Sequence, residues 1–219
     1  MLNYVEYGKE NKYDDDIFFQ KYSQMSRSQQ GLAGAGEWET LRKLLPDFKD
    51  KRVLDLGCGY GWHCIYAMEH GASSVVGVDI SHKMLEVAKE KTHFPQVEYK
   101  CCAIEDVEFP EESFDVILSS LAFHYVADYE ILVKKIYRIL KSGGKLVFTV
   151  EHPVFTAYGT QDWYYNEKGE ILHFPVDNYY YEGKRTAVFL GEKVTKFHRT
   201  LTTYLNTLLS NGFIINHIV

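Results

Sequence analysis

The chain has 219 residues, of which 46% are hydrophobic and 25% charged, as in ordinary folded globular proteins, so wholesale disorder is excluded. This length suits one large α/β domain, or one domain with a small appendage. The net charge of −6 makes bulk DNA or RNA a poor candidate partner. Since no apolar run approaches the roughly 18–20 residues that span a membrane, we expect no membrane partner.

The cysteines indicate a reducing compartment. Cys58, Cys64, Cys101 and Cys102 form no CxxC pair, so they suggest neither a zinc site nor a disulfide framework. No histidine spacing with acidic support suggests another metal. The polar, acidic residues from Met1 to Asp16 are unlike a signal peptide. We therefore expect reduced thiols, no metal and a cytoplasmic location.

The N-terminal part of the chain is predicted to be separate from the main domain. Residues 23–36 are rich in Ser, Gln and Gly, which is typical of a mobile connector or flap. Apolar residues at helical spacing then predict a helix over 37–45, which Pro46 ends. We divide the chain into a flap or connector over 1–36 and a domain over 37–219.

Strands and helices then alternate. Short apolar runs predict strands, and capping residues such as Ser81 and Asp128 mark the starts of helices. This alternation predicts right-handed crossovers and an α/β fold with a doubly wound, mostly parallel sheet flanked by helices. The expected strands cover 52–56, 74–79, 97–102, 114–119 and 145–150, and the expected helices cover about 62–70, 82–91 and 129–140.

The alternation breaks after residue 152. An aromatic-rich insertion follows over about 153–190, then a predicted helix over 196–210 and a strand-like segment over 213–219. The insertion holds six of the chain's 17 tyrosines, so it is either a cap over a binding site or a hairpin whose rings pack on the sheet.

A glycine-rich turn follows the first predicted strand. The segment VLDLGCGYG runs from Val53 to Gly61, and its glycines allow a sharp turn and close approach of a ligand to the backbone. Asp79 ends the next strand, where a carboxylate suits a ribose diol. Asp55 lies two residues before Gly57 and could engage a cationic amine or the loop backbone. A bare glycine turn is also compatible with a simple tight βα turn.

These segments together resemble the class I S-adenosylmethionine-dependent methyltransferases, in particular the methyltransferase type 11-like family. VLDLGCGYG is similar to the first motif of that family, and the order of the later motifs also matches, from about Lys51 to Glu151. The later motifs are VGVDIS from Val76, AIED from Ala103, FDVILS from Phe114 and LKSGGKL from Leu140. The resemblance implies a Rossmann-like fold and S-adenosyl-L-methionine as the cofactor.

The resemblance also implies roles for individual residues. Asp79 would bind the ribose, and many relatives carry Asp where this chain has Ala103, so the adenine contact would pass to neighbouring residues. The side chains of Ile80 and Met84 would pack on the adenine, although ordinary core packing explains them equally well. The implied cofactor-binding set is completed by Tyr22, Arg27, Asp55, Gly57, Cys58, Gly59, Gly61, Ile104, Glu105, Asp106, Ser119 and Leu121.

Two histidines are candidates for a catalytic base. His124 follows the fourth predicted strand and His152 follows the fifth, and a histidine titrates near neutral pH. Methyl transfer needs alignment of the nucleophile, and a base only if that nucleophile must lose a proton. Either histidine could instead merely order its loop.

The methyl acceptor is expected to be a small molecule. The negative net charge disfavours nucleic acid, and aromatic walls in the insertion suit a small, partly apolar acceptor. Two alternatives remain open at this point, namely a nicotinamide-dependent oxidoreductase and a non-catalytic module that keeps the fold. The glycine spacing GxGxG, rather than GxGxxG, argues against the oxidoreductase.

The resemblance implies a sixth strand and an antiparallel seventh. Residues 213–219 can supply only the sixth, so we expect a seventh strand to be missing or the chain to be truncated. An unpaired sheet edge tends to pair with another chain. This predicts poor order or chain–chain pairing at the C-terminus, as in a homodimer.

Overall fold

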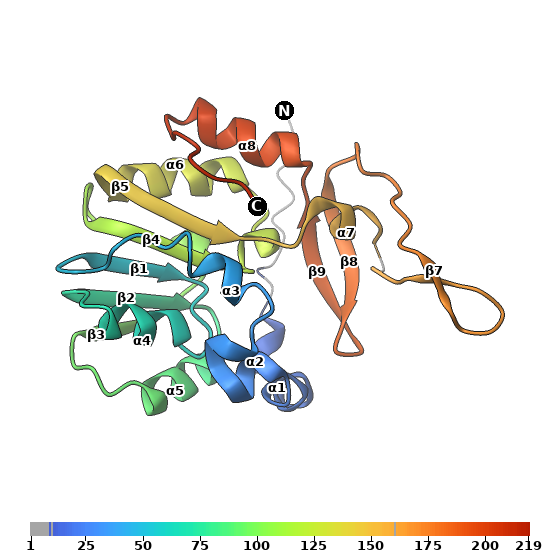
Figure 1. The fold of residues 1–219 in the computed structure, drawn as a ribbon, viewed down its shortest axis with the longest axis horizontal. Helices are drawn as coiled ribbons and strands as arrows, with labels where there is room; N and C mark the ends of the chain where they lie inside the picture. The colour runs from blue at the N-terminus through green and yellow to red at the C-terminus, as the bar shows by residue number, and fades with distance from the viewer. Residues whose placement is uncertain (1–8, 10, 160) are drawn as a thin grey trace.

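A five-stranded sheet forms the centre of the molecule (Figure 1). The computed structural model describes residues 9, 11–159 and 161–219. The strands are parallel and lie in the order β3-β2-β1-β4-β5. Their bounds are β1 Arg52–Leu56, β2 Ser74–Asp79, β3 Val97–Cys101, β4 Phe114–Ser120 and β5 Leu140–Thr149. The predicted parallel α/β sheet is confirmed.

The order of the strands creates a crevice at the centre of the sheet. Strand β1 pairs with β2 on one side and with β4 on the other, so that Leu54 lies between Val76 and Ile117. The chain runs from β1 outward through β2 to β3 on one side and then crosses back to β4 and β5 on the other side. In open parallel sheets, ligands bind at the carboxyl ends of the strands at such a switch point.

Helices cover both faces of the sheet (Figure 1). Side chains alternate along a strand, so Val53 of β1 faces one core and Leu54 faces the other. The Val53 core contains side chains of α4, Trp62–Glu69, and α5, His82–Lys91. The Leu54 core contains side chains of α6, Tyr129–Ile139, and α8, Leu201–Ser210.

The segment before the sheet, for which the composition of residues 23–36 predicts a mobile connector or flap, forms a series of short helices. It contains η1 Lys12–Asp14, α1 Asp16–Ser23, α2 Ser26–Gln30, η2 Gly31–Gly34 and α3 Trp38–Leu41. Ser28 donates its hydroxyl to the Tyr22 carbonyl oxygen at 2.7 Å, which ties α2 to α1. The helix expected over 37–45 is only the single turn α3. Residues 1–8 and 10 of the predicted flap lie outside the described residues.

Two hairpins follow the short helix α7, Pro153–Ala157. The first pairs β6, Tyr164–Tyr165, with β7, Ile171–His173, and projects away from the body (Figure 1). The second pairs β8, Gly183–Phe189, with β9, Glu192–His198, so the insertion extends beyond residue 190.

The helix predicted over 196–210 begins later, because residues 196–198 belong to β9. Helix α8 starts at Leu201, where the Thr200 hydroxyl accepts a hydrogen bond from the Thr203 amide at 3.1 Å and caps the helix. The strand expected over 213–219 is wrong as well, since this described segment pairs with no strand. After the left-handed Gly212, Phe213 and Ile215 pack against the core instead.

Candidate functional site

A cavity of about 260 Å³ lies at the carboxyl ends of β1, β2 and β4. The sheet side of its lining includes the glycine turn after β1, the end of β2 and the loop after β4. The other side is closed by the N-terminal helices and by Phe189 of β8. The predicted residues that line it are Tyr22, Arg27, Gly57, Gly59, Asp79, Ile80, Met84, Ile104, Glu105, Leu121 and His124.

The glycine turn is held against the end of β2. The amides of Gly57 and Cys58 donate to the Val78 carbonyl oxygen at 2.8 and 2.9 Å. Gly59 has a φ of +52°, and a side chain added there would meet no atom within 4 Å, so its backbone faces open space. A ligand can therefore approach the Gly59 backbone directly. Gly61 lies outside the cavity lining, and a side chain there would overlap the Tyr99 hydroxyl.

Asp79 joins the glycine turn to the next helix. One carboxylate oxygen accepts from the Gly59 amide at 2.8 Å, and the other accepts from the Ser81 amide at 2.9 Å. Burial raises the pKa of Asp79, and these two amides act in the opposite direction by stabilising the ionised form. The result is an oriented carboxylate in the wall of the cavity.

Asp55 is buried behind the turn and is not among the described residues that line the cavity. One of its oxygens lies 3.5 Å from the Cys64 sulfur, and its Oδ1 has no hydrogen-bond partner within the described part of the chain. Burial raises the pKa of Asp55 to about 7. The buried Asp55 carboxyl group beside the glycine turn therefore titrates near neutral pH.

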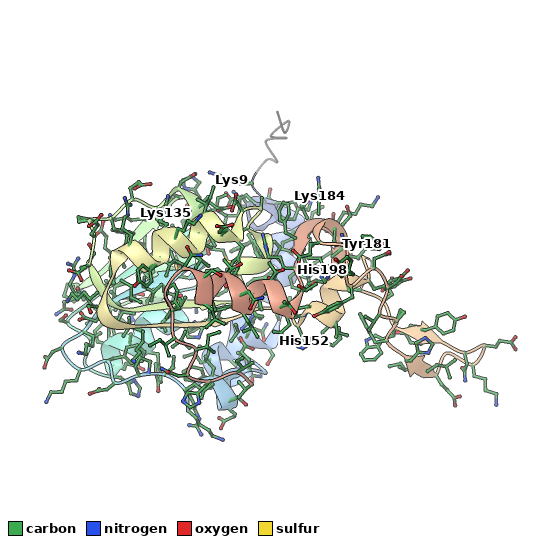
Figure 2. The ribbon with its side chains drawn as sticks, turned by 90° about the horizontal axis from the view of Figure 1, so that it is seen from above. Lys9, Lys135, His152, Tyr181, Lys184 and His198 are labelled. Carbon is green, nitrogen blue, oxygen red and sulfur yellow. The ribbon has the colours of Figure 1, made fainter. Side chains whose placement is uncertain are left out.

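The short helix η3, Ile104–Asp106, forms the wall beyond β3. Ile104 and Glu105 line the cavity together with Ala103, Ile80 and Met84. Burial raises the pKa of Glu105. Asp106 lies outside the lining and pairs with Lys9, which itself lines the cavity and is labelled in Figure 2.

The N-terminal helices supply Tyr22, Met25 and Arg27 to the lining. Arg27 forms an ion pair with Glu37, and Glu37 also accepts from the Ser120 hydroxyl at 3.1 Å. Burial raises the pKa of Glu37, but the charge of Arg27 and the hydrogen bonds outweigh it and leave the pKa below its usual value. This charged network connects the N-terminal helices to the end of β4.

A smaller pocket adjoins the first at the start of α4. Cys58 lines it, together with Tyr22, Arg27, Gly57 and Gly59, which line both pockets. Trp62 Nε1 and His63 Nε2 have no hydrogen-bond partner among the described residues, although both atoms are buried. Burial lowers the pKa of His63 to about 4, so this ring is neutral at pH 7. Two unpaired nitrogens therefore belong to residues that line this pocket.

His124 and Glu151 also line the cavity. His124 belongs to η4, Phe123–Tyr125, and its Nδ1 accepts from the Glu151 amide at 3.5 Å. Burial lowers the pKa of His124 to about 4, so the ring is neutral near pH 7. The Glu151 carboxylate pairs with the buried Lys196 and accepts from the Gln161 amide at 2.8 Å.

His152 and Ser119 are not among the described residues that line the cavity. His152 is exposed, and its Nδ1 accepts from the Val154 amide at 3.2 Å, which caps α7. In Figure 2 it lies at the base of the insertion. Ser119 is buried and donates to the Leu56 carbonyl oxygen at 2.8 Å, which joins β4 to β1.

Sequence reasoning missed several lining residues, including Tyr13, Ser120, Tyr125, Glu151 and Phe189. Glu151 directly follows the strand predicted over 145–150, so the same reasoning that selected His152, which also follows that strand, could have found it. None of the six tyrosines of the predicted cap lines the cavity, and Phe189 is the described residue that the 153–190 segment contributes. Tyr13 lies far from every motif, and only the folded chain brings it to the site.

Known proteins resemble this chain along most of its length. A family model described as "Methyltransferase domain" matches residues 54–148. A methyltransferase structure from Listeria monocytogenes, described as S-adenosylmethionine dependent, is 58% identical, with a TM-score of 0.81 over 84% of this chain and 86% of that one. One from Mesorhizobium loti with the same description is 42% identical, with a TM-score of 0.79 over 85% of each chain.

A further relative has a named reaction. The "Ubiquinone biosynthesis O-methyltransferase" of Coxiella burnetii is 36% identical over 112 residues, which are 50% of this chain and 47% of that protein. The match thus spans about half of each protein.

Proposed function

The chain belongs to the class I S-adenosylmethionine-dependent methyltransferases, and from this premise we propose that its cavity transfers the cofactor's methyl group to a small-molecule acceptor. The single observation that carries the proposal is the oriented carboxylate of Asp79, hydrogen-bonded to Gly59 where the backbone faces open space. The spacing GxGxG and the relatives favour methyl transfer over nicotinamide chemistry.

The residues present fit S-adenosyl-L-methionine. We propose that Asp79 binds the ribose hydroxyls and that Ile80, Met84 and Ile104 flank the adenine. Toward the methionine end, Arg27 offers a guanidinium that can fork a carboxylate. Trp62 and His63 line the adjoining pocket, and their buried Nε1 and Nε2 atoms have no hydrogen-bond partner among the described residues. We propose that these nitrogens provide further polar contacts. The rest of the proposed contact set is Tyr22, Gly57, Cys58, Gly59, Glu105 and Leu121.

Four residues that the sequence predicts to bind the cofactor lie outside the cavity lining. Asp55 and Gly61 shape the glycine turn, Ser119 fastens β4 to β1, and Asp106 pairs with Lys9. We propose that these four act by positioning the lining residues.

The bound cofactor would supply a methyl group carried on a sulfonium. The acceptor's nucleophile would bond to the methyl carbon in line, and the neutral thioether would leave. The chain's own task is to hold the acceptor in line and to exclude water. We propose that His124 touches the acceptor, because it lines the cavity. Its Nδ1 faces the Glu151 amide, so in the neutral ring Nε2 carries the proton and donates. A pKa of about 4 makes His124 a weak base, so we assign it first to orienting the acceptor.

We propose that the helices before residue 36 act as a lid and that the insertion walls the acceptor side through Phe189. Glu151 faces the same end of the cavity. Burial raises its pKa, but His124, Lys196 and its hydrogen bonds outweigh this and leave the pKa below its ordinary value, so Glu151 is ionised at neutral pH. An ionised carboxylate repels anionic groups. We therefore expect neutral or cationic acceptors to bind better than carboxylates.

The C. burnetii relative, named for an O-methylation, supports a small acceptor. No helix among the described residues is long and apolar enough to cross a membrane. The homodimer, the cytoplasmic location and the exclusion of nucleic acid remain predictions.

The direct test of the proposed function is transfer of a labelled methyl group from S-adenosylmethionine to a library of metabolites, with products identified by mass spectrometry. We expect at least one methylated small molecule, and a matched library with amine, hydroxyl and carboxylate ends will show which end is preferred. Cofactor binding without any product would support the non-catalytic module instead. Binding of NADH in place of S-adenosylhomocysteine would support the oxidoreductase.

A further inference from the structure

Three tyrosines from separate parts of the chain meet in the cavity. Tyr13 belongs to η1, Tyr22 to α1 and Tyr125 to η4, and all three line the cavity wall. The rings of Tyr13 and Tyr22 lie 5.2 Å apart at 89°, and those of Tyr13 and Tyr125 lie 6.5 Å apart at 88°. The hydroxyl oxygens of Tyr13 and Tyr125 are 3.4 Å apart. We call these three rings the tyrosine cluster.

The tyrosine cluster lines the same cavity as Asp79 and Arg27, which mark the two ends of the proposed cofactor site. Burial raises the pKa of Tyr22, and the charges of Arg27 and Asp79 also act on it, so the ring lies within electrostatic reach of both. Burial likewise raises the pKa of Tyr13, with a smaller contribution from Asp79. Asp79 marks the proposed ribose position and Arg27 the proposed carboxylate position. The sulfonium of the cofactor joins these two parts chemically, so it belongs between them.

Three acidic side chains near the tyrosine cluster already have other partners, whereas Glu105 belongs to the η3 wall of the cavity. Asp79 accepts two backbone amides, Glu151 pairs with Lys196, and Glu37 pairs with Arg27. A positive charge between Asp79 and Arg27 therefore meets the aromatic rings of the tyrosine cluster. Aromatic faces attract cations, and the attraction is larger where water is excluded.

We propose that the tyrosine cluster recognises the positive charge of the sulfonium, so that the cavity binds the charged cofactor more tightly than its neutral thioether product. This inference rests on the proposed function. In the transfer, the electron pair of the carbon–sulfur bond stays on sulfur, the methyl carbon bonds to the nucleophile, and the sulfur loses its charge. The attraction to the rings disappears at that moment, which weakens binding of S-adenosylhomocysteine and favours its release.

The test compares three ligands by isothermal titration calorimetry on the full chain. S-adenosylmethionine carries a sulfonium, sinefungin carries an ammonium group at the same position, and S-adenosylhomocysteine is neutral there. We expect both cations to bind at least about tenfold more tightly than S-adenosylhomocysteine. Tyr22→Leu and Tyr125→Leu should each reduce this ratio to about threefold or less.

Two matched variants keep the result interpretable. Tyr22→Phe retains the ring and should keep the wild-type ratio, whereas Tyr181→Leu, on an exposed tyrosine of the insertion, should change nothing. If wild type binds all three ligands equally, or if the ratio survives in folded Tyr22→Leu and Tyr125→Leu, the inference is wrong while the cofactor site stands. If S-adenosylhomocysteine fails to bind wild type at all, the proposed function fails first and this inference fails with it.

Discussion

Asp79→Asn isolates the contribution of the carboxylate that we propose to bind the ribose, with almost no change in side-chain shape. The native carboxylate accepts the Gly59 amide at 2.8 Å and the Ser81 amide at 2.9 Å. Asparagine has one acceptor oxygen, so one of these amides would face an NH₂ group, and an unsatisfied buried donor costs about 1–3 kcal/mol. Hydrogen bonds from ribose to a neutral amide are weaker than those to a carboxylate by about 1 kcal/mol each.

The weaker ribose hydrogen bonds predict that Asp79→Asn weakens S-adenosylhomocysteine binding by about 2 kcal/mol, or about 30-fold. The unpaired amide is present with and without the ligand, so it lowers the free energy of unfolding instead. Calorimetric titration measures this directly. Asp115→Asn is the matched control, because Asp115 accepts from the Arg52 amide at 2.9 Å and from Lys141 at 3.0 Å, and it is not among the described residues that line the cavity. The control should bind within about twofold of wild type. A folded Asp79→Asn that binds as tightly as wild type would refute the assignment of Asp79.

Three further variants test the supports of the site. Arg199 is buried and donates to the carbonyl oxygens of Val126 and Ala127 in the loop after β4, so Arg199→Leu should lower the free energy of unfolding by about 3 kcal/mol in urea and Arg199→Lys should restore part of it. An equally stable Arg199→Leu would contradict this role. Lys196→Met leaves Glu151 without its buried partner and should cost about 3 kcal/mol, whereas Lys193→Met, on the exposed side of the same strand, should cost under about 0.5 kcal/mol. Burial raises the pKa of Asp55 from 3.8 to about 7, so the native state binds a proton that the unfolded state releases. Stability from this group therefore falls as the pH rises from about 4 to about 7, and Asp55→Asn should remove that fall from urea-unfolding curves recorded across this range, whereas identical slopes would count against it.

The sheet and its ligand-binding edge were predictable because their signals are local. The strand β1, the turn Gly57–Gly61 and the acid Asp79 all occur within one βαβ unit. Pairing of its two strands brings the turn and Asp79 together. The caps Ser81 and Asp128 mark their helices correctly, since each side chain accepts from an amide three residues ahead. Such caps depend only on residues within one helical turn, so the sequence alone predicts them.

The lid and the acceptor side were less predictable because they depend on tertiary contacts. The composition of residues 23–36 suggests a loop, yet Ser28 and the ion pair of Arg27 with Glu37 hold it as helices. Tyr13 and Tyr125 are 112 residues apart and meet only in the folded chain. For the insertion, composition suggested tyrosines that wall a binding site. Tyr180 and Tyr181 are exposed instead of directed into the cavity.

A crystal structure with S-adenosylhomocysteine bound tests the central claim most directly. The account predicts the ribose hydroxyls on the Asp79 carboxylate, the ligand's carboxylate near Arg27, the adenine between Ile80 and Ile104, and the thioether sulfur against the tyrosine cluster. A ligand bound elsewhere, or bound in this cavity with its ribose away from Asp79, would contradict it.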